Sequence, residues 1–395
     1  MSEAFRIEHD IIGEMHIPQD VYYGIHSVRA AENFPITGQR LQRDMIVSIA
    51  WIKKACARAN LAAGTIREDV SRAIEQACDE IIAGRLHDQF IVDPIQGGAG
   101  TSTNMNANEV IANRALELLG HRKGEYQYLH PNEQVNIGQS TNDVYPSALK
   151  IATWFGILGL IDAMAVLRQA FEAKAEEFQD VLKMGRTQLQ DAVPMTLGQE
   201  FSTYAVMLGE DEQRLREAVL LLCEINMGAT AIGTGITAHP DYAPLVLRHL
   251  REITGIPLQT APNLIEATQD CGAFVQLSGV LKRVAVKLSK TCNDLRLLSS
   301  GPRAGLGEIN LPPMQAGSSI MPGKVNPVIP EVVNQIAFEV IGNDITVTFA
   351  AEAGQLQLNA FEPIIAHSLF KSVGHLRNGC LTLAERCVKG ITANR

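Results

Sequence analysis

The segment 317–327 carries the densest set of chemically reactive side chains in this chain. Its sequence, Gly-Ser-Ser-Ile-Met-Pro-Gly-Lys-Val-Asn-Pro, places two hydroxyls, an ammonium group and an amide among two glycines and two prolines. Glycine permits backbone angles that are closed to other residues, and proline keeps the segment out of a regular helix. We therefore expect an active-site lid with Ser318, Ser319, Lys324 and Asn326 as its functional groups. A flexible surface connection is the alternative, since Gly/Ser/Pro composition is also typical of linkers.

Three further polar segments, all rich in hydroxyls and amides, interrupt an otherwise helical pattern. They are Gln-Gly-Gly-Ala-Gly-Thr-Ser-Thr-Asn-Met-Asn-Ala-Asn-Glu at 96–109, Gln-Ser-Thr-Asn-Asp at 139–143 and Gly-Arg-Thr-Gln-Leu-Gln-Asp at 185–191. Such groups bind carboxylates when they are gathered, and Lys324 supplies the full charge that they lack. The first segment leads into a helical pattern, so its donors are expected at a helix N-terminus, which suits an anion. A purely structural capping role is the alternative for this segment.

Several common kinds of catalytic site have no signature in this chain. The ten histidines form no H-x-x-x-H pair and no His/Cys cluster, and no G-x-G-x-x-G follows a strand. Ser318 is not part of a G-x-S-x-G nucleophile elbow. We therefore expect no metal and no cofactor. Acid–base chemistry on a small anion is the remaining interpretation.

Composition indicates a globular protein. A length of 395 residues with 46% apolar residues allows about two or three domains and a large core. The formal charge of -9 argues against a general nucleic-acid binder, which needs a basic face. We expect no signal peptide in the opening segment, no run of membrane-spanning length and no membrane partner. Seven cysteines without a C-x-x-C pair are typical of reduced thiols, so a cytoplasmic location is expected.

Helical periodicity dominates after a short β segment. Alternation over residues 5–17 predicts a strand or hairpin, and strand signals are scarce afterwards. Residues 43–85 predict two short helices, a further helix is expected from Pro330, and long apolar stripes predict helices over 151–178, 197–222, 274–295 and 365–387. The expected fold is mainly all-α, a long-helix bundle with a small N-terminal β element. Stripes of this length would leave apolar surface exposed in one subunit, so we expect an oligomer.

The four polar segments resemble conserved blocks of the aspartase/fumarase superfamily, in the expected order. Further stretches at 22–26, 97–102, 228–235 and 327–335 resemble the aspartase branch more than the fumarases. The resemblance covers essentially the whole chain. It implies an N-terminal domain over 1–140 and a central bundle domain over 141–395. Members of the superfamily continue into a small C-terminal helical domain, which we expect to be absent from this chain.

The resemblance also implies an activity and assigns roles to residues. The activity is the reversible deamination of L-aspartate to fumarate and ammonium, with Ser318 abstracting the proton from carbon 3 to give an enediolate. The carboxylate next to the amine would be held by Thr187, Lys324 and Asn326. The other carboxylate would be held by Thr101, Ser140, Thr141 and Ser319. Asn142 would lie near the leaving amine. Donors aimed at the carboxylate that becomes the enediolate stabilise the transition state more than the ground state.

The positions of the polar segments along the chain bear on assembly. Ser140 precedes the predicted long helix and Thr187 follows it, and the roughly 40 residues between them span about 60 Å at 1.5 Å per residue. One subunit cannot easily bring both to one small substrate. The resemblance implies a homotetramer in which each site draws its segments from three subunits.

Gln188 stands where many superfamily members have histidine. Glutamine can orient a substrate but cannot act as a general acid near neutral pH, so ammonia must leave with little help or from another donor. Two other functions stay open at this point. The chain could be a fumarate hydratase, or a catalytically silent member with a structural or binding role.

Overall fold

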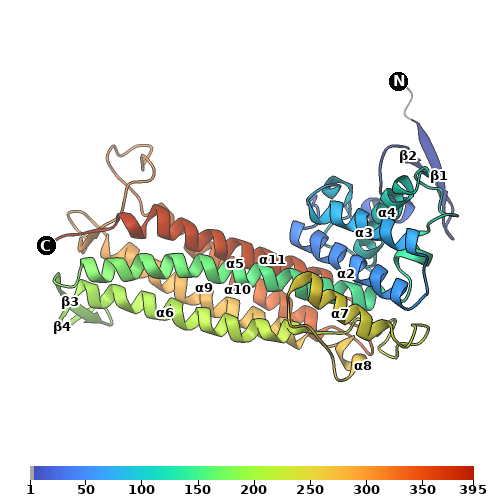
Figure 1. Cartoon of the computed structure of the whole chain (residues 1–395). Coiled ribbons are helices and arrows are strands. Elements are labelled where there is room, and N and C mark those ends of the chain that lie inside the picture. The colour runs from blue at the N-terminus through green and yellow to red at the C-terminus, as the bar shows by residue number, and fades with distance from the viewer. Residues whose placement is uncertain (1–3) are drawn as a thin grey trace. The chain divides into compact units, whose positions relative to one another are not determined.

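The computed structural model describes residues 4–395, which fold into two compact units (Figure 1). Unit 1 contains the residues up to Phe155 with Leu221–Ala273 and Val347–His367. Unit 2 contains Gly156–Leu220, Phe274–Thr346 and Ser368–Arg395. The opening segment, in which no signal peptide is expected, lies partly outside the described residues. The predicted mainly helical fold with a small N-terminal β element is confirmed.

Unit 1 starts with an antiparallel hairpin and continues with helices. Its elements are β1 (Phe5–His9), β2 (Glu14–Pro18), α1 (Ile25–Asn33), α2 (Arg43–Ala62), α3 (Glu68–Ile82), α4 (Thr101–Leu118), a π-helical turn (Pro131–Val135), β5 (Glu224–Ile225), α7 (Tyr242–Thr254), β6 (Gln259–Thr260) and α8 (Leu264–Ala267). β1 pairs with β2, and β5 pairs in parallel with β6. The stripe of Ile46, Ile49 and Ile52 is buried, so the two helices predicted over 43–85 are confirmed as α2 and α3.

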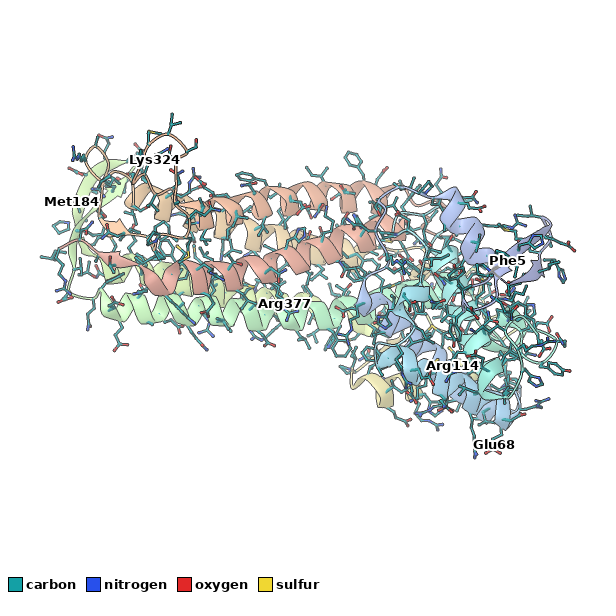
Figure 2. The ribbon with its side chains drawn as sticks, turned by 90° about the horizontal axis from the view of Figure 1, so that it is seen from above. Phe5, Glu68, Arg114, Met184, Lys324 and Arg377 are labelled. Carbon is teal, nitrogen blue, oxygen red and sulfur yellow. The ribbon has the colours of Figure 1, made fainter. Side chains whose placement is uncertain are left out.

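Unit 2 is a bundle in which long helices run side by side (Figures 1 and 2). It contains the later part of α5 (Thr141–Glu177) and parts or all of α6 (Leu197–Val219), α9 (Gly272–Leu298), α10 (Val328–Glu352) and α11 (Glu362–Arg386), with β3 (Leu182–Thr187), β4 (Gln190–Thr196), β7 (Ile309–Asn310) and β8 (Thr392–Ala393). In its core the ring of Tyr204 lies 5.3 Å from Phe171 and 5.7 Å from Phe201, centroid to centroid. The four long helices predicted from apolar stripes are confirmed as α5, α6, α9 and α11.

The longest helix, α5, begins earlier than the apolar stripe predicted. It starts at Thr141 and not near Ile151, so Pro146 lies inside it. Proline has no N–H and leaves the carbonyl four residues earlier without its helical donor. That carbonyl belongs to Asn142, and the side-chain amide of Asn226 donates to it at 3.0 Å. A contact distant in sequence therefore makes the proline tolerable.

The same helix corrects the expectation about membrane-spanning runs. α5 contains an 18-residue window with a mean hydropathy of 1.6, which is long and apolar enough to span a membrane. The prediction that no run reaches that length is therefore wrong. Half of the window is buried inside the protein, and core helices of bundles pass the same test.

Two polar segments form elements that the sequence did not predict. Residues 185–191 lie in the antiparallel hairpin β3–β4, where a simple connection into the next helix was expected. α4 begins at Thr101, so much of the expected loop over 96–109 is already helical. In both cases the side chains are polar and carry no apolar period that would indicate the element.

Glu362 at the start of α11 should make stability depend on pH. Its side chain is buried, and burial raises the pKa of its carboxyl to about 8, opposed by the charge of Lys150. A group whose pKa is raised in the folded state contributes stability that is fully present when the pH lies below its unfolded-state pKa. This contribution is lost as the pH rises through the folded-state pKa. We expect Glu362→Gln to gain Tm relative to wild type, on the order of 4 °C, between about pH 5 and pH 8.5 in scanning calorimetry. The exposed Glu385→Gln is the matched control, and an equal pH slope in all three proteins would contradict the assignment.

Candidate active site

The first polar segment makes a tight turn that starts α4. Ala99 and Gly100 have positive φ values of 57° and 91°, and a Cβ on Gly100 would lie 2.2 Å from the ring of Tyr145. Only glycine fits this position. Thr101 is thereby the first residue of the helix, and its exposed hydroxyl donates to the carbonyl of Gly98 at 2.7 Å. The predicted placement of this segment at a helix N-terminus is confirmed.

The second segment forms the first turn of α5. The hydroxyl of Ser140 accepts from the backbone N–H of Asn142 at 3.2 Å, and the carboxylate of Asp143 accepts in return from the N–H of Ser140 at 3.0 Å. Asp143 also accepts from the N–H of Thr230 at 3.0 Å. Burial raises the pKa of Asp143 to about 7, and these bonds oppose that rise. The side-chain NH2 of Asn142 donates to the carbonyl of Ala231 at 2.7 Å, which leaves its amide oxygen as the acceptor.

A network of amides lies behind Thr141. The Thr141 Oγ accepts from Asn104 Nδ2 at 3.1 Å, and the same NH2 donates to Asn136 Oδ1 at 3.2 Å. Lys53, which has no exposed surface, donates to Asn136 Oδ1 at 2.9 Å and to Gln139 Oε1 at 2.7 Å. Burial lowers the pKa of the Lys53 ammonium to about 8. The Thr141 hydroxyl is thus connected through two amides to a buried cation.

The third segment presents its two predicted residues at the tip of the β3–β4 hairpin. Thr187 pairs with Gln190, and Gln188 and Leu189 form the two-residue turn with φ values of 54° and 62°. Positive φ at both turn positions defines a type I′ turn, which matches the twist of the strands. Thr187 and Gln188 are exposed in this single chain. The hairpin therefore holds both side chains outward.

Ion pairs fix the base of this hairpin. Lys183 pairs with Glu200 and, at 2.8 Å, with Glu308, and Arg186 pairs with Glu308 at 2.5 Å. Glu308 lies just before the segment that leads to the Ser318 loop. One carboxylate therefore connects the strand that carries Thr187 with the start of the segment that carries Ser318.

The Ser318 loop closes on itself through its backbone. Gly317 has a φ of 87°, and a Cβ there would lie 1.5 Å from the carbonyl oxygen of Lys324, so the position requires glycine. The N–H of Ser318 donates to that carbonyl at 3.2 Å. The Ser318 Oγ accepts from the backbone N–H groups of Ile320 at 3.3 Å and Met321 at 3.1 Å. The half-buried Ser318 hydroxyl thus sits where its own loop would favour negative charge on the oxygen.

The ten predicted site residues fall into two groups. Unit 1 holds four of them, at the starts of α4 and α5, and unit 2 holds six, on the hairpin and the Ser318 loop: Thr101, Ser140, Thr141 and Asn142, then Thr187, Gln188, Ser318, Ser319, Lys324 and Asn326. Figure 2 shows Met184 of β3 and Lys324 at the same end of unit 2. Lys324 and Ser319 are exposed, and Asn326 is half-buried.

The family model described as lyase matches residues 13–342. The chain belongs to the lyase family. Aspartate ammonia-lyase of Helicobacter pylori (strain ATCC 700392 / 26695) is 63% identical over 391 residues, which make up 98% of this chain and 84% of that protein. Aspartate ammonia-lyase of Escherichia coli (strain K12) is 58% identical over 398 residues, covering 100% of this chain and 83% of that protein.

Solved structures agree with this lyase assignment. A crystal structure of fumarate lyase:delta crystallin from Brucella melitensis bound to cobalt has a TM-score of 0.98 and 56% identity, covering 99% of this chain and 85% of that one. Class II fumarase from Schistosoma mansoni has a TM-score of 0.96 at 34% identity, with 99% and 85% covered. The predicted membership of the aspartase/fumarase superfamily, and of its aspartase branch, is confirmed.

Some residues in the hydrogen-bond network around the predicted site residue Thr141 were not found from the sequence. Asn104 lies in a stretch interpreted as a loop, and its helical spacing with Asn108 is the signal that could have placed both amides on one face. Lys53 follows Ile49 at four residues, so it shares the buried face of α2, but nothing near it in sequence indicates its amide partners. Asn136 lies before α5 and carries no periodic signal.

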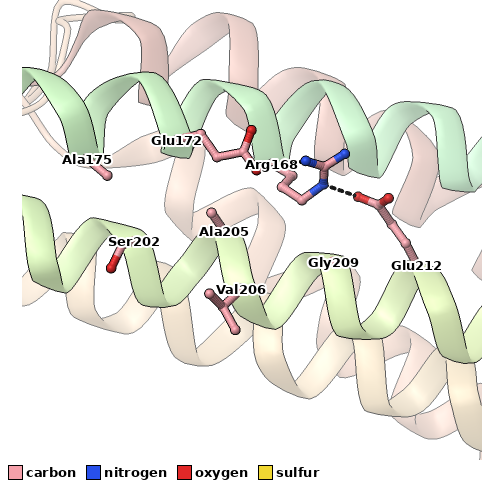
Figure 3. Close-up of a pocket in the computed structure, with 8 residues that line it drawn as sticks. All are labelled: Arg168, Glu172, Ala175, Ser202, Ala205, Val206, Gly209 and Glu212. Carbon is pink, nitrogen blue, oxygen red and sulfur yellow. Dashed lines mark hydrogen bonds and ion pairs between the residues drawn. The ribbon is translucent and has the colours of Figure 1, made fainter.

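A groove between α5 and α6 in unit 2 of the lyase is a different feature (Figure 3). It has a volume of about 510 Å3 and contains none of the predicted site residues. Its charged groups already satisfy one another, because Arg168 pairs with Glu212 at 2.8 Å and with Glu172 at 2.7 Å. Within residues 4–395 there is no group of three or more His, Cys, Asp or Glu side chains placed to hold a metal ion.

Proposed function

We propose that this enzyme converts L-aspartate reversibly to fumarate and ammonium, with Ser318 as the base that removes the proton from carbon 3. The relatives named aspartate ammonia-lyase support the reaction. The two N–H groups that donate to Ser318 Oγ carry the assignment of the base. Hydrogen bonds to the charged form of a group lower its pKa, so both bonds favour a serine alkoxide. The loop thereby supplies what a serine needs to act as a base.

Thr187, Lys324 and Asn326 would bind the carboxylate beside the amine. When the proton leaves carbon 3, negative charge moves onto the oxygens of the carboxylate attached to that carbon, so donors that meet this charge contribute most to rate. The carboxylate on carbon 3 is the one that does not lie beside the amine, and it would be held by Thr101, Ser140, Thr141 and Ser319. In the assignment carried by the superfamily, Asn142 lies near the amine, and its free amide oxygen suits an N–H donor. Gln188 would orient the substrate without acting as an acid.

We propose that the enzyme assembles as a homotetramer with sites shared between subunits. α10 carries an exposed apolar stripe in which Phe338, Ile345 and Phe349 are 62%, 54% and 69% accessible, as expected for a surface covered by another subunit. α5 begins at Thr141 and ends ten residues before Thr187, and its 37 residues make a helix about 55 Å long. A substrate as short as L-aspartate cannot reach both ends of such a helix. Seven buried free cysteines support the expected reducing, cytoplasmic location.

Lys324→Ala should raise KM for L-aspartate and lower kcat together. The ammonium would bind the carboxylate beside the amine in the ground state and would also fix the position of carbon 3 relative to Ser318, so its loss weakens substrate binding and misaligns the proton to be removed. We expect a fall in kcat/KM of at least about 100-fold, from initial rates of fumarate formation. Lys324→Arg is the companion variant, and it should restore little because the planar fork needs different space. Unchanged kinetics in Lys324→Ala would remove this lysine from the site.

Absorbance of fumarate, followed after adding L-aspartate and then L-malate, tests the reaction itself. A rise with L-aspartate alone supports the proposal. A rise with L-malate alone would assign a fumarate hydratase, the alternative favoured by the likeness to class II fumarase. No rise with either substrate would leave a catalytically silent member of the superfamily.

A further inference from the structure

Lys53 is a buried cation whose direct hydrogen bonds go to neutral groups. The two acceptors of its ammonium are the amide oxygens of Asn136 and Gln139. Asp143 acts on it as a charge, and burial still lowers the pKa of Lys53 to about 8. The neighbouring Lys54 instead pairs with Asp79, which is largely exposed. Burying an ammonium group costs free energy unless its hydrogen bonds compensate. The burial of Lys53 against neutral amides therefore calls for a functional explanation.

Asn136 Oδ1 is the junction of these bonds. It accepts from Lys53 Nζ at 2.9 Å and from the NH2 groups of Asn104 and Asn108, both at 3.2 Å. Three donors converge on one oxygen, which fixes the orientation of the Asn104 amide with its NH2 toward Asn136. The same NH2 also reaches Thr141 Oγ at 3.1 Å. The orientation of the Asn104 amide therefore determines what Thr141 can do.

Thr141 is left as a donor by this arrangement. A hydroxyl has one proton to donate and two lone pairs that accept. Because Asn104 donates to the Thr141 oxygen, the hydroxyl proton points away from that amide and is available to an anion. A charged group at the far end of a hydrogen-bonded chain polarises it and strengthens each bond. Gln139, the second partner of Lys53, lies two residues before Thr141 and ties the approach to α5 to the same cation.

We propose that Lys53 is a positioning residue for carboxylate recognition, which acts through Asn136 and Asn104 to hold the Thr141 hydroxyl as a donor to the carboxylate that is not beside the amine. The proposal rests on the proposed function, since it assumes that Thr141 binds a dicarboxylate. Lys53 itself lies too deep to touch the substrate.

Calorimetric titration with succinate, alongside L-aspartate kinetics, measures the effect of Lys53→Met. We expect the Kd for succinate and KM for L-aspartate to rise roughly tenfold, the usual size for one charge-assisted hydrogen bond. kcat should fall as well, because this carboxylate is attached to carbon 3 and takes up the negative charge of the enediolate in the transition state. Lys54→Met is the matched control on the same helix and should leave both values unchanged. Tenfold loss in both lysine variants, or in neither, overturns the proposal.

A double-mutant cycle with Thr141→Val separates positioning from general structural damage. If Lys53 acts through the Thr141 hydroxyl, Lys53→Met should cost little more once that hydroxyl is gone, so the two losses in succinate affinity are far from additive. Additive losses overturn the proposal. If Lys53→Met does not fold by circular dichroism, Asn104→Leu takes its place in the cycle with the same two outcomes.

The succinate arm also keeps this proposal distinct from the reaction. Wild-type protein that binds succinate but does not consume L-aspartate would refute the proposed function and leave the cycle valid. Wild-type protein that does not bind succinate would overturn the role of Lys53 in carboxylate recognition.

Discussion

Ser318→Ala is expected to give a folded protein that binds succinate as wild type does and has lost nearly all turnover of L-aspartate. A positioned general base contributes about 10²- to 10⁴-fold to rate, so kcat should fall by that factor. Succinate affinity should be kept because Ser318 is assigned to the proton and not to a carboxylate. The measurements are fumarate absorbance for turnover and calorimetry for binding.

Ser319→Ala is the matched control for this prediction. It removes the neighbouring, exposed hydroxyl, which is assigned to a carboxylate, so it should weaken succinate binding, raise KM and lower kcat by less than Ser318→Ala does. The contrast between adjacent serines tests the assignment and not merely the integrity of the loop. If Ser318→Ala kept a tenth of wild-type kcat, a loss of only about 1.4 kcal/mol, a different group must be the base.

The helices of this protein could be predicted because burial imposes a period on apolar residues. The stripe from Phe274 to Leu295 is buried at nearly every apolar position and lies within α9, which exceeds it by a few residues at each end. Helix ends carry no such period, so they were the least accurate part of the prediction.

The β3–β4 hairpin could not be predicted by the same reasoning. Its two-residue turn uses Gln188 and Leu189 at positive φ, where glycine, asparagine or aspartate would give the usual signal. The start of α5 was missed because Pro146 is normally a helix boundary. Asn226, 80 residues further on, supplies the donor that makes this proline acceptable, and no local pattern contains that information.

The site itself could be predicted only as a list of residue types. Hydroxyls, amides and Lys324 indicate binding of a small anion, which the resemblance to the superfamily narrows to a dicarboxylate, and the glycine at 317 indicates a loop with unusual backbone angles. The sequence does not show that two backbone N–H groups donate to the Ser318 oxygen, or that the Asn104 amide donates to the Thr141 oxygen. Both are consequences of folding.

Mixing two inactive variants is expected to restore activity. Ser318→Ala and Thr141→Ala subunits, co-denatured in equal amounts and refolded together, should recover about a quarter of the wild-type rate if each site takes Ser318 and Thr141 from different subunits at random. The reason is that half of the contributed Ser318 loops and half of the contributed Thr141 helices are unmutated, so a quarter of sites have both. Each variant refolded alone should stay inactive. The rate is followed by fumarate absorbance and mixed assembly by mass spectrometry.

Ser318→Ala refolded with Lys324→Ala is the control that makes the result specific. Both substitutions lie in one loop, six positions apart in the same chain, and the Ser318 N–H donates to the Lys324 carbonyl within that loop. Every site built around such a loop contains one mutated residue, whichever subunit provides it, so mixing should recover no activity. Recovery in the first mixture alone requires Thr141 and Ser318 to come from different chains. Mixed tetramers without recovered activity in the first mixture would mean that each site is built within one chain. The inference of shared sites from the length of α5 would then be wrong.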